Sequence, residues 1–161
     1  MNKALTELSP GDAPFTPHKG WGPLLGVHLS VAGGLENVLH SAVQVGCDCV
    51  QIFVKNQRQW RAPPLRNEQI ERFRAAQGAT HVAPVIAHAS YLLNLASPDN
   101  RARLGSVRAL TDELERCEAL GVTGLVLHPG AQLTPVATKP RRLSAALGPQ
   151  PKGKALSFRV R

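Results

Sequence analysis

The chain has 161 residues, of which 43% are hydrophobic and 4% aromatic, and its formal net charge is +8. This length is enough for one domain with a core, and no stretch approaches the ~20 consecutive apolar residues of a membrane-spanning helix, which argues against a membrane protein. Seven basic residues and no acidic residue lie in 132–161, so the rest of the chain has a net charge of only +1 and is not a generally basic body.

The first 23 residues mix proline, glycine and charged side chains and contain no apolar segment typical of a secretory signal. We expect them to form a flexible leader. The three cysteines, Cys47, Cys49 and Cys117, are odd in number and have no framework spacing. They predict free thiols and a cytoplasmic protein. Cys47 and Cys49 as a metal-binding pair is the weaker alternative, because no second pair accompanies them.

Four short apolar runs, each separated from the next by a segment of helical periodicity, predict the fold. A strand–helix alternation of this kind requires parallel strands with right-handed crossovers, so the fold class is α/β with about four parallel strands and intervening helices. The strands are expected at residues 24–29, 49–54, 85–88 and 122–128.

The three helices expected between these strands have recognisable ends. Gly46 ends the first helix, Asn67 caps the second, and Ser97 followed by Pro98 begins the third. An apolar stripe on the third helix is expected to face the core. Its members are Leu104, Val107, Thr111, Leu114 and Cys117. Residues 134–161 are basic and proline-rich without clear periodicity, and we expect them to be disordered.

Histidines follow three of the predicted strands, and we expect them to meet at one face of the sheet. His28, His88 and His128 stand at the carboxyl ends, where parallel α/β sheets place their functional sites. Histidine is a common zinc ligand, so His88 and His128 are candidate ligands, and His28 is a candidate support for a ligand or a substrate contact. The alternative is that each histidine satisfies a hydrogen bond at the sheet rim.

A hydrolytic metal centre also needs carboxylates, and no acidic residue directly follows a predicted strand. Glu113, Glu115 and Glu118 lie on the predicted third helix, and we expect them mostly on solvated faces. From the residues alone the metal site is therefore incomplete.

The loop at 55–61 (K-N-Q-R-Q-W-R) combines cations, amides and an indole. Such a mixture can follow phosphates while planar groups contact bases. The alternative is a solvated loop whose Trp60 lies against the body. Tyr91 and Leu92, which follow the third strand, are expected on the same face, with packing on the long helix as their alternative.

Four segments of the chain are distinctive: G-V-H-L-S with A-G-G from residue 26, K-N-Q-R-Q-W from 55, H-A-S-Y-L-L-N-L from 88 and H-P-G from 128. Together they resemble endonuclease IV, the zinc-dependent enzyme that acts at apurinic/apyrimidinic sites in DNA. Their order and spacing fit across residues 24–133. The resemblance implies a TIM barrel with three zinc ions at its carboxyl face, which promote phosphodiester cleavage 5′ to abasic sites in duplex DNA.

The resemblance also implies roles for individual residues. His88 and His128 resemble two zinc ligands of the family. Arg58, Tyr91 and Leu92 resemble side chains that enter the minor groove at the lesion, and Asn56 and Gln57 lie in the same DNA-recognition loop. Two positions depart from the family pattern: Ala89 stands where aspartate is usual, and Ala131 where serine is usual.

The main departure from the family is length, because four predicted strands make only the N-terminal half of a TIM (β/α)8 barrel. The family segments that carry the carboxylate ligands are absent, so we expect at most weak partial zinc binding and no activity from this chain alone. We also expect the open barrel edges to cause self-association or aggregation. Three hypotheses follow: a truncated DNA-repair endonuclease, a fragment of a sugar isomerase or epimerase barrel, and a non-enzymatic DNA-binding remnant.

Overall fold

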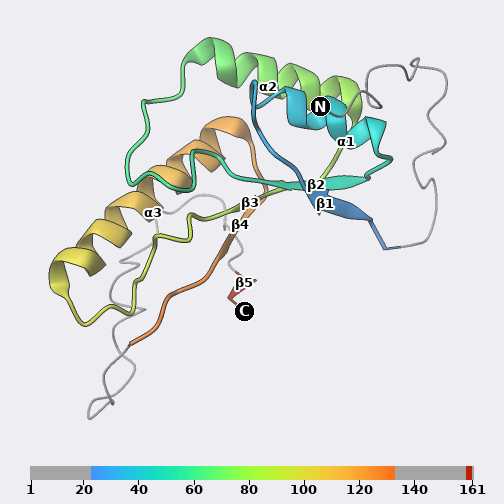
Figure 1. Cartoon of the computed structure of the whole chain (residues 1–161). Helices are drawn as coiled ribbons and strands as arrows, with labels where there is room; N and C mark the ends of the chain where they lie inside the picture. The colour runs from blue at the N-terminus through green and yellow to red at the C-terminus, as the bar shows by residue number, and fades with distance from the viewer. Residues whose placement is uncertain (1–22, 133–158, 161) are drawn as a thin grey trace, which may run out of the picture.

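A computed structural model describes residues 23–132 and 159–160, and these contain three helices that alternate with parallel strands (Figure 1). The apolar runs form the strands and the periodic segments form the helices, so the predicted strand–helix alternation is confirmed. In chain order the elements are β1 (Gly26–His28), α1 (Asn37–Gln44), β2 (Cys49–Ile52), α2 (Asn67–Thr80), β3 (Val85–His88), α3 (Asn100–Leu120), β4 (Gly124–Leu127) and β5 (Arg159–Val160).

The described strands form one sheet in the order β1-β2-β3-β4-β5, with every neighbouring pair parallel. Consecutive parallel strands that lie side by side and are joined by helices are the pattern of a barrel wall. The register pairs His28 with Gln51 and His88 with Val126, so the carboxyl ends of the strands lie at one edge. The architecture is that of the N-terminal half of a TIM barrel.

The helices build the core on the outer face of the sheet. In Figure 1, α1 and α2 lie together above the strands, and α3 lies to their left. Strand side chains alternate between two faces. Val50, Ile52, Val85 and Ala87 are at most 2% exposed, whereas the intervening Gln51 is only partly buried. One face of the sheet is therefore buried beneath the helices. The other face has no helix on it within the described residues.

The second helix begins one residue earlier than the sequence predicts. Arg66, not Asn67, is the capping residue, and its backbone N–H donates to Gln69 Oε1 at 3.0 Å. A side chain three residues into the helix thus reaches back to the cap. On its inward face Phe73 and Ala76 are buried, and Ile70 packs against the core.

The third helix differs from its prediction at its start and on its buried face. The cap is Asp99, whose carboxylate accepts from the Ala102 N–H, instead of Ser97. Leu104 is 47% exposed and Thr111 is exposed, so they do not belong to the core. The residues that are buried are Ser106, Ala109, Leu110, Glu113, Arg116, Cys117 and Leu120.

Glu113 contradicts its predicted solvated position, because it is only 1% exposed. Helical periodicity places charged residues outside by default. Here Glu113 and Arg116 are buried because both have hydrogen-bonding partners in the interior. The buried face of α3 is therefore rotated about the helix axis relative to the predicted apolar stripe.

The two edges of the sheet differ in what lies beside them. β1 is exposed along its length, with Val27 48% and the preceding Leu24 and Leu25 each 55% exposed. At the other edge, β5 lies beside β4. The leader expected at residues 1–23 lies outside the described residues apart from Pro23, and the same holds for the disorder expected over 134–161 apart from β5, a strand that the sequence did not indicate.

Candidate functional site

Rings from four strand ends form a continuous cluster at the carboxyl edge of the sheet. The centroid of the His88 ring lies 6.1 Å from that of His28 and 5.2 Å from that of His128. Phe53 fills the space between β1 and β3, with its centroid 4.5 Å from His28 and 5.5 Å from His88. The three strand-end histidines therefore gather in a row with His88 at its centre.

The central histidine has a fixed orientation. His88 is 7% exposed, and its Nδ1 lies 2.7 Å from the carbonyl oxygen of Ala89. Because a carbonyl oxygen can only accept, the Nδ1 of His88 carries a proton and donates this hydrogen bond. A backbone carbonyl behind one ring nitrogen is a usual way of orienting a metal-binding histidine.

His28 is held in the same manner from the neighbouring strand. Its Nδ1 lies 3.0 Å from Gln51 Oε1 across the β1–β2 pair. Burial lowers the pKa of His28 below its ordinary value; the hydrogen bond with Gln51 opposes this effect, and the charge of a protonated His88 adds to it. The neutral imidazole is thus favoured, which is the form that binds a metal or accepts a proton.

The donors do not make up a multinuclear zinc site. Within residues 23–132 and 159–160, no three or more His, Cys, Asp or Glu side chains are grouped so as to hold a metal ion. His88 and His128 lie close enough to share a neighbourhood, but the row includes no carboxylate. A hydrolytic zinc cluster needs such anionic ligands to balance its charge. The described residues therefore do not fit a multinuclear zinc centre.

The loop of residues 55–61 is folded back on itself. Asn56 is exposed, and its Oδ1 accepts from the Arg58 N–H at 2.9 Å, while its carbonyl accepts from the Gln59 N–H at 3.1 Å. Asparagine commonly forms such turns. Arg58 and Gln59 are exposed at the tip, and Gln57 is partly buried.

The loop after β3 is fastened to this loop. Ser90 Oγ donates to the Gln57 carbonyl at 2.7 Å and accepts from the Leu92 N–H at 3.2 Å. Tyr91 is 65% exposed, so it does not pack on α3, and its ring centroid lies 5.0 Å from that of His88 and 6.2 Å from that of His128. Leu92 is partly buried. Tyr91 thus lies over the histidine row as an exposed aromatic side chain.

The H-P-G segment fits the loop after β3 from the other side. The Pro129 carbonyl accepts from the Leu95 N–H at 2.9 Å, and Asn94 Nδ2 donates to the Ala131 carbonyl at 3.1 Å. Gly130 has φ +89°, and a Cβ there would collide with Asn94. Only glycine satisfies both conditions. The N-L and H-P-G motifs are therefore two halves of one packed junction.

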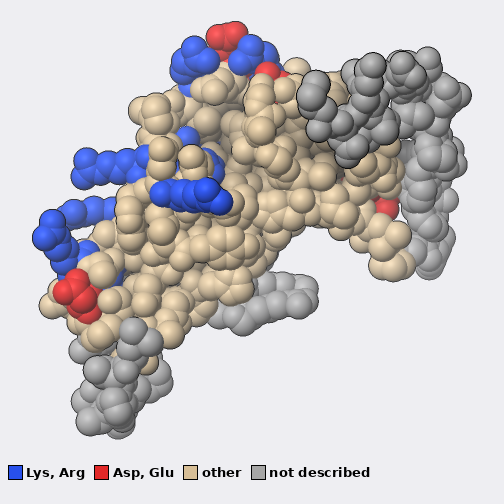
Figure 2. All heavy atoms as spheres, viewed as in Figure 1, with Lys and Arg blue, Asp and Glu red and all other residues tan. Residues whose placement is uncertain are grey.

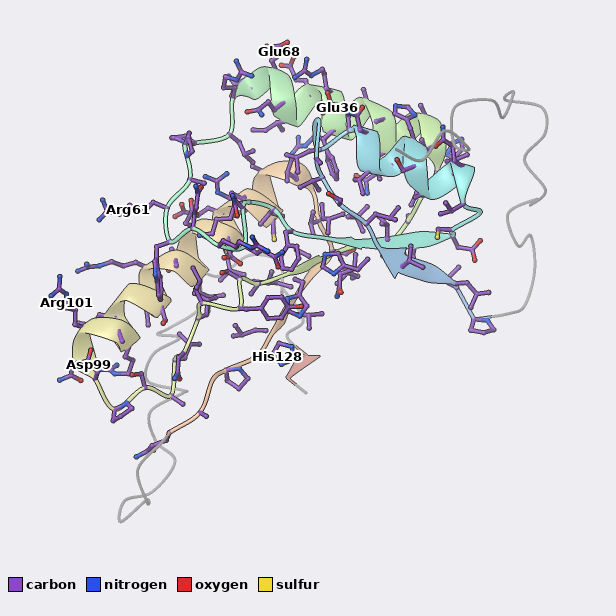
Figure 3. All side chains as sticks on the ribbon, in the orientation of Figure 1. Glu36, Arg61, Glu68, Asp99, Arg101 and His128 are labelled. Carbon is purple, nitrogen blue, oxygen red and sulfur yellow. The ribbon has the colours of Figure 1, made fainter. Side chains whose placement is uncertain are left out.

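Exposed arginines continue along one flank. Arg58 and Arg61 come from the loop after β2, and Arg101 and Arg108 come from α3. Figure 2 shows blue side chains projecting from the left of the molecule, and in Figure 3 Arg61 and Arg101 point outward on this side. An open pocket of ≈ 400 Å³ lies there, between the loop and the helix. Its lining is Trp60, Arg61, Ala62, Gly105, Arg108, Ala109 and Asp112.

Two residues of this region are not among the site residues that the sequence predicts. Phe53 follows β2 and joins the histidine row, and the signal for it was its place at a strand end. Glu113 lies beneath the loops, accepting from the Ser90 N–H at 3.1 Å, and nothing in the helical periodicity identifies it.

The chain is similar to known proteins over most of this region. A family model described as xylose isomerase-like TIM barrel matches residues 39–147. A probable endonuclease 4 of Chloroflexus aurantiacus is 46% identical over 109 residues, which are 68% of this chain and 38% of the relative. One of Nitratidesulfovibrio vulgaris is 46% identical over 111 residues, covering 69% and 39%. This chain thus spans about two fifths of the length of these relatives.

Solved structures give the same picture. Endonuclease IV from Thermus thermophilus superposes with a TM-score of 0.69 at 36% identity, covering 78% of this chain and 45% of that one. D-psicose 3-epimerase from Clostridium cellulolyticum has a TM-score of 0.51 at 20% identity, covering 65% and 36%, and this similarity shows the fold alone.

The half-barrel sheet, the strand-end histidine row and these similarities agree with one another. The chain belongs to the xylose isomerase-like TIM-barrel family and, within it, is endonuclease IV-like.

Proposed function

We propose that residues 24–133 form the lesion-probing part of an endonuclease IV-like protein, which binds duplex DNA at abasic sites. The observation that carries this proposal is the joining of two loops by Ser90. The cation-bearing loop at 55–61 and the loop that bears Tyr91 are fixed to each other at the carboxyl edge of the sheet. A rigid pair of loops can insert side chains into a groove without first losing conformational entropy.

In this proposal the side chains of the two loops have separate tasks. Arg58, with Asn56 and Gln57 beside it, contacts the backbone and the minor groove of the DNA. Tyr91 and Leu92 fill the space that a missing base leaves, as apolar wedges do in other minor-groove binders. The arginine flank supplies phosphate contacts, so affinity falls steeply with salt concentration.

Cleavage belongs to the family's complete barrel, and we do not expect it from these 161 residues. His88 and His128 would bind zinc weakly as a pair, without the carboxylates that a phosphodiester-cleaving cluster needs. The link to cleavage therefore comes only from the names of the relatives, whereas the proposed DNA binding is argued from this chain's own side chains. The free thiols support work in the reducing cytoplasm.

The test compares a duplex that carries a tetrahydrofuran abasic analogue with the intact duplex of the same sequence, by fluorescence anisotropy at several salt concentrations. We expect the abasic duplex to bind more tightly, and Arg58→Ala or Tyr91→Ala to abolish the preference. Arg74→Ala, an exposed arginine on α2, is the matched control. Equal affinity of the wild type for both duplexes would overturn the proposal.

The same samples test cleavage. Incubation of the abasic duplex with the protein and zinc should leave the strand intact on a denaturing gel. Zinc-dependent, chelator-sensitive incision that is lost in His88→Ala would show that the chain is a functioning nuclease.

The second candidate is a sugar isomerase or epimerase fragment, favoured by the match to the xylose isomerase-like TIM-barrel family model and by the strand-end histidines. Its ligand would be a ketose bound near the histidine row, and the exposed Arg58 would not contribute to binding it. Ketose-induced thermal stabilisation that is unaffected by Arg58→Ala would support this candidate. A third candidate, a DNA-binding remnant without lesion preference, predicts salt-dependent binding that is equal for the two duplexes.

We also propose that the chain associates with itself through its open sheet. In the part of the chain that the structure describes, no helix covers the inner face of the sheet, and apolar residues are exposed at the β1 edge; both features support this association.

A further inference from the structure

We propose that Glu113 and Lys55, a buried ion pair beneath the two loops, are positioning residues for Tyr91 and Arg58. This inference rests on the proposed function, because it assigns the device that orients the DNA-probing side chains. It concerns residues that make no contact with the DNA themselves.

The pair connects three separate segments of the chain. Lys55 Nζ lies 3.4 Å from Glu113 Oε1 and 3.0 Å from Asp112 Oδ2, both on α3. It also donates to the Trp60 carbonyl at 3.3 Å, at the far end of its own loop. The ammonium group therefore closes the loop that carries Arg58 and fixes that loop to the helix.

The carboxylate holds the second loop. Both oxygens of Glu113 accept from the Ser90 N–H, at 3.3 and 3.1 Å, immediately before Tyr91. The Ser90 hydroxyl then spans to the Gln57 carbonyl at 2.7 Å. Thus one charged pair fixes the backbone of both loops, the one that carries Arg58 and the one that carries Tyr91.

The same arrangement extends to the end of the first loop. Arg116 Nε lies 3.0 Å from Asp112 Oδ1, and its Nη2 donates to the carbonyls of Ala62 and Pro63 at 3.2 and 2.6 Å. Charged side chains of α3 therefore hold the chain at both ends of the segment from Lys55 to Pro63.

A gain in folding stability does not by itself explain why this ion pair is buried. The side chains of Lys55 and Glu113 are 2% and 1% exposed. Burial raises the pKa of the Glu113 carboxyl, and the charge of Lys55 and the Ser90 N–H only partly oppose that effect. Well-packed apolar residues often replace a buried ion pair with little loss of stability. What such residues cannot replace is the directed hydrogen bond to the Ser90 N–H.

This difference gives a test that separates positioning from stability. The double variant Lys55→Met with Glu113→Leu fills the same space with apolar atoms but loses the acceptor for Ser90. Glu113→Gln is the conservative partner, because its amide oxygen still accepts from the Ser90 N–H while Lys55 keeps Asp112. We expect both variants to fold, with unfolding midpoints in urea close to that of the wild type.

Tyr91 is the only tyrosine of the chain, so 3-fluorotyrosine labelling gives a single ¹⁹F resonance that reports its position without DNA. We expect the wild type and Glu113→Gln to share one narrow line away from the frequency in urea. The double variant is expected to move towards the urea frequency and broaden. An unchanged line in the folded double variant would overturn the inference, whatever the chain does with DNA.

DNA binding is the second readout. The preference for the abasic over the intact duplex should fall about tenfold in the double variant and be largely kept in Glu113→Gln. If the wild type binds the abasic and the intact duplex equally, the proposed function is wrong. The ¹⁹F line of Tyr91 then still shows whether Glu113 and Lys55 position this residue. If the double variant does not fold, Glu113→Leu alone decides instead, because it removes the acceptor for the Ser90 N–H while Lys55 keeps Asp112. A wild-type line and preference in that variant would overturn the inference.

Discussion

The three thiols of the chain have different surroundings, and these set their chemistry. Cys117 is completely buried on α3, where burial and the nearby Glu113 carboxylate raise the pKa of its thiol to about 12. Burial and the charge of Asp48 raise the pKa of Cys49. Cys47 is partly exposed. The thiolate is the nucleophile, so the residue of the three that is best placed to react is Cys47.

We expect Cys117 to resist alkylation in the folded protein. At pH 8 its thiolate fraction is about a thousandfold below that of an ordinary thiol, since each unit of pKa changes this fraction about tenfold. Iodoacetamide labelling followed by mass spectrometry of peptides should show Cys47 modified first and Cys117 only after urea is added. Equal rates for the two thiols in the native protein would contradict the buried position of Cys117.

Gly130 of the H-P-G segment gives a second prediction for a single residue. Gly130→Ala should lower the free energy of unfolding by about 2 kcal/mol, because alanine is strained at φ +89° and its Cβ displaces Asn94. Urea unfolding monitored by circular dichroism measures the change. Gly78→Ala is the control: this glycine lies in α2 with open space around it, and alanine there should stabilise the helix by up to about 1 kcal/mol. Loss of stability in the control but not in Gly130→Ala would refute this account.

At the scale of the elements, the strands could be predicted from the sequence and the buried face of α3 could not. Strands of a parallel sheet, whose two faces are normally both covered, appear as short apolar runs, and β3 lies at the predicted residues 85–88. On α3, an assignment by hydropathy selects Leu104 and Thr111, which are exposed. It misses Glu113 because the partners that permit its burial, Lys55 and Ser90, are distant in sequence.

The candidate site shows the same division. The strand-end histidines and the DNA-loop residues could be named from the sequence, because each stands next to a recognisable strand or motif. The hydrogen bond from Ser90 to Gln57 spans 33 residues and depends on the register of β2 with β3. Contacts of that kind follow from the assembled sheet, and no local pattern encodes them.

The start of α3 gives a prediction for an element. Asp99→Ala should destabilise the protein by about 1 kcal/mol, because its carboxylate accepts from the Ala102 N–H at the helix end and interacts favourably with the positive end of the helix dipole. Thr111→Ala, an exposed position in the middle of the same helix, should change the stability by less than about 0.5 kcal/mol. Chemical unfolding of both variants tests this. A larger effect of Thr111→Ala than of Asp99→Ala would show that the cap does not stabilise α3.

At the scale of the whole molecule, the sheet is covered by helices on one face and ends at β1 in an exposed apolar strand. Parallel strands are normally covered on both faces, and barrel closure removes free edges. No helix of the described residues is long and apolar enough to cross a membrane. Within residues 23–132 and 159–160 no helix covers the second face of the sheet, which distinguishes this half barrel from a closed one.

We expect the protein to sediment as a concentration-dependent mixture of species larger than the 17.3 kDa chain. Val27→Lys places a charge on the exposed edge strand and should shift the mixture towards the monomer, because an edge lysine disfavours strand pairing. Arg74→Lys, on α2, should leave the distribution unchanged. Sedimentation velocity over a wide concentration range measures both. A wild type that is monomeric throughout would exclude association through this sheet.

The tie between Lys55 and the helix at Asp112 and Glu113 has a consequence for synthesis of the chain on the ribosome. The lysine is made 57 residues before Asp112. At the usual rate of about 5–20 residues per second, it waits roughly 3 to 11 s before its anionic partners are made. During that interval the Lys55 ammonium group has only water as its partner, so the loop that it anchors can take its final position only after α3 has been made.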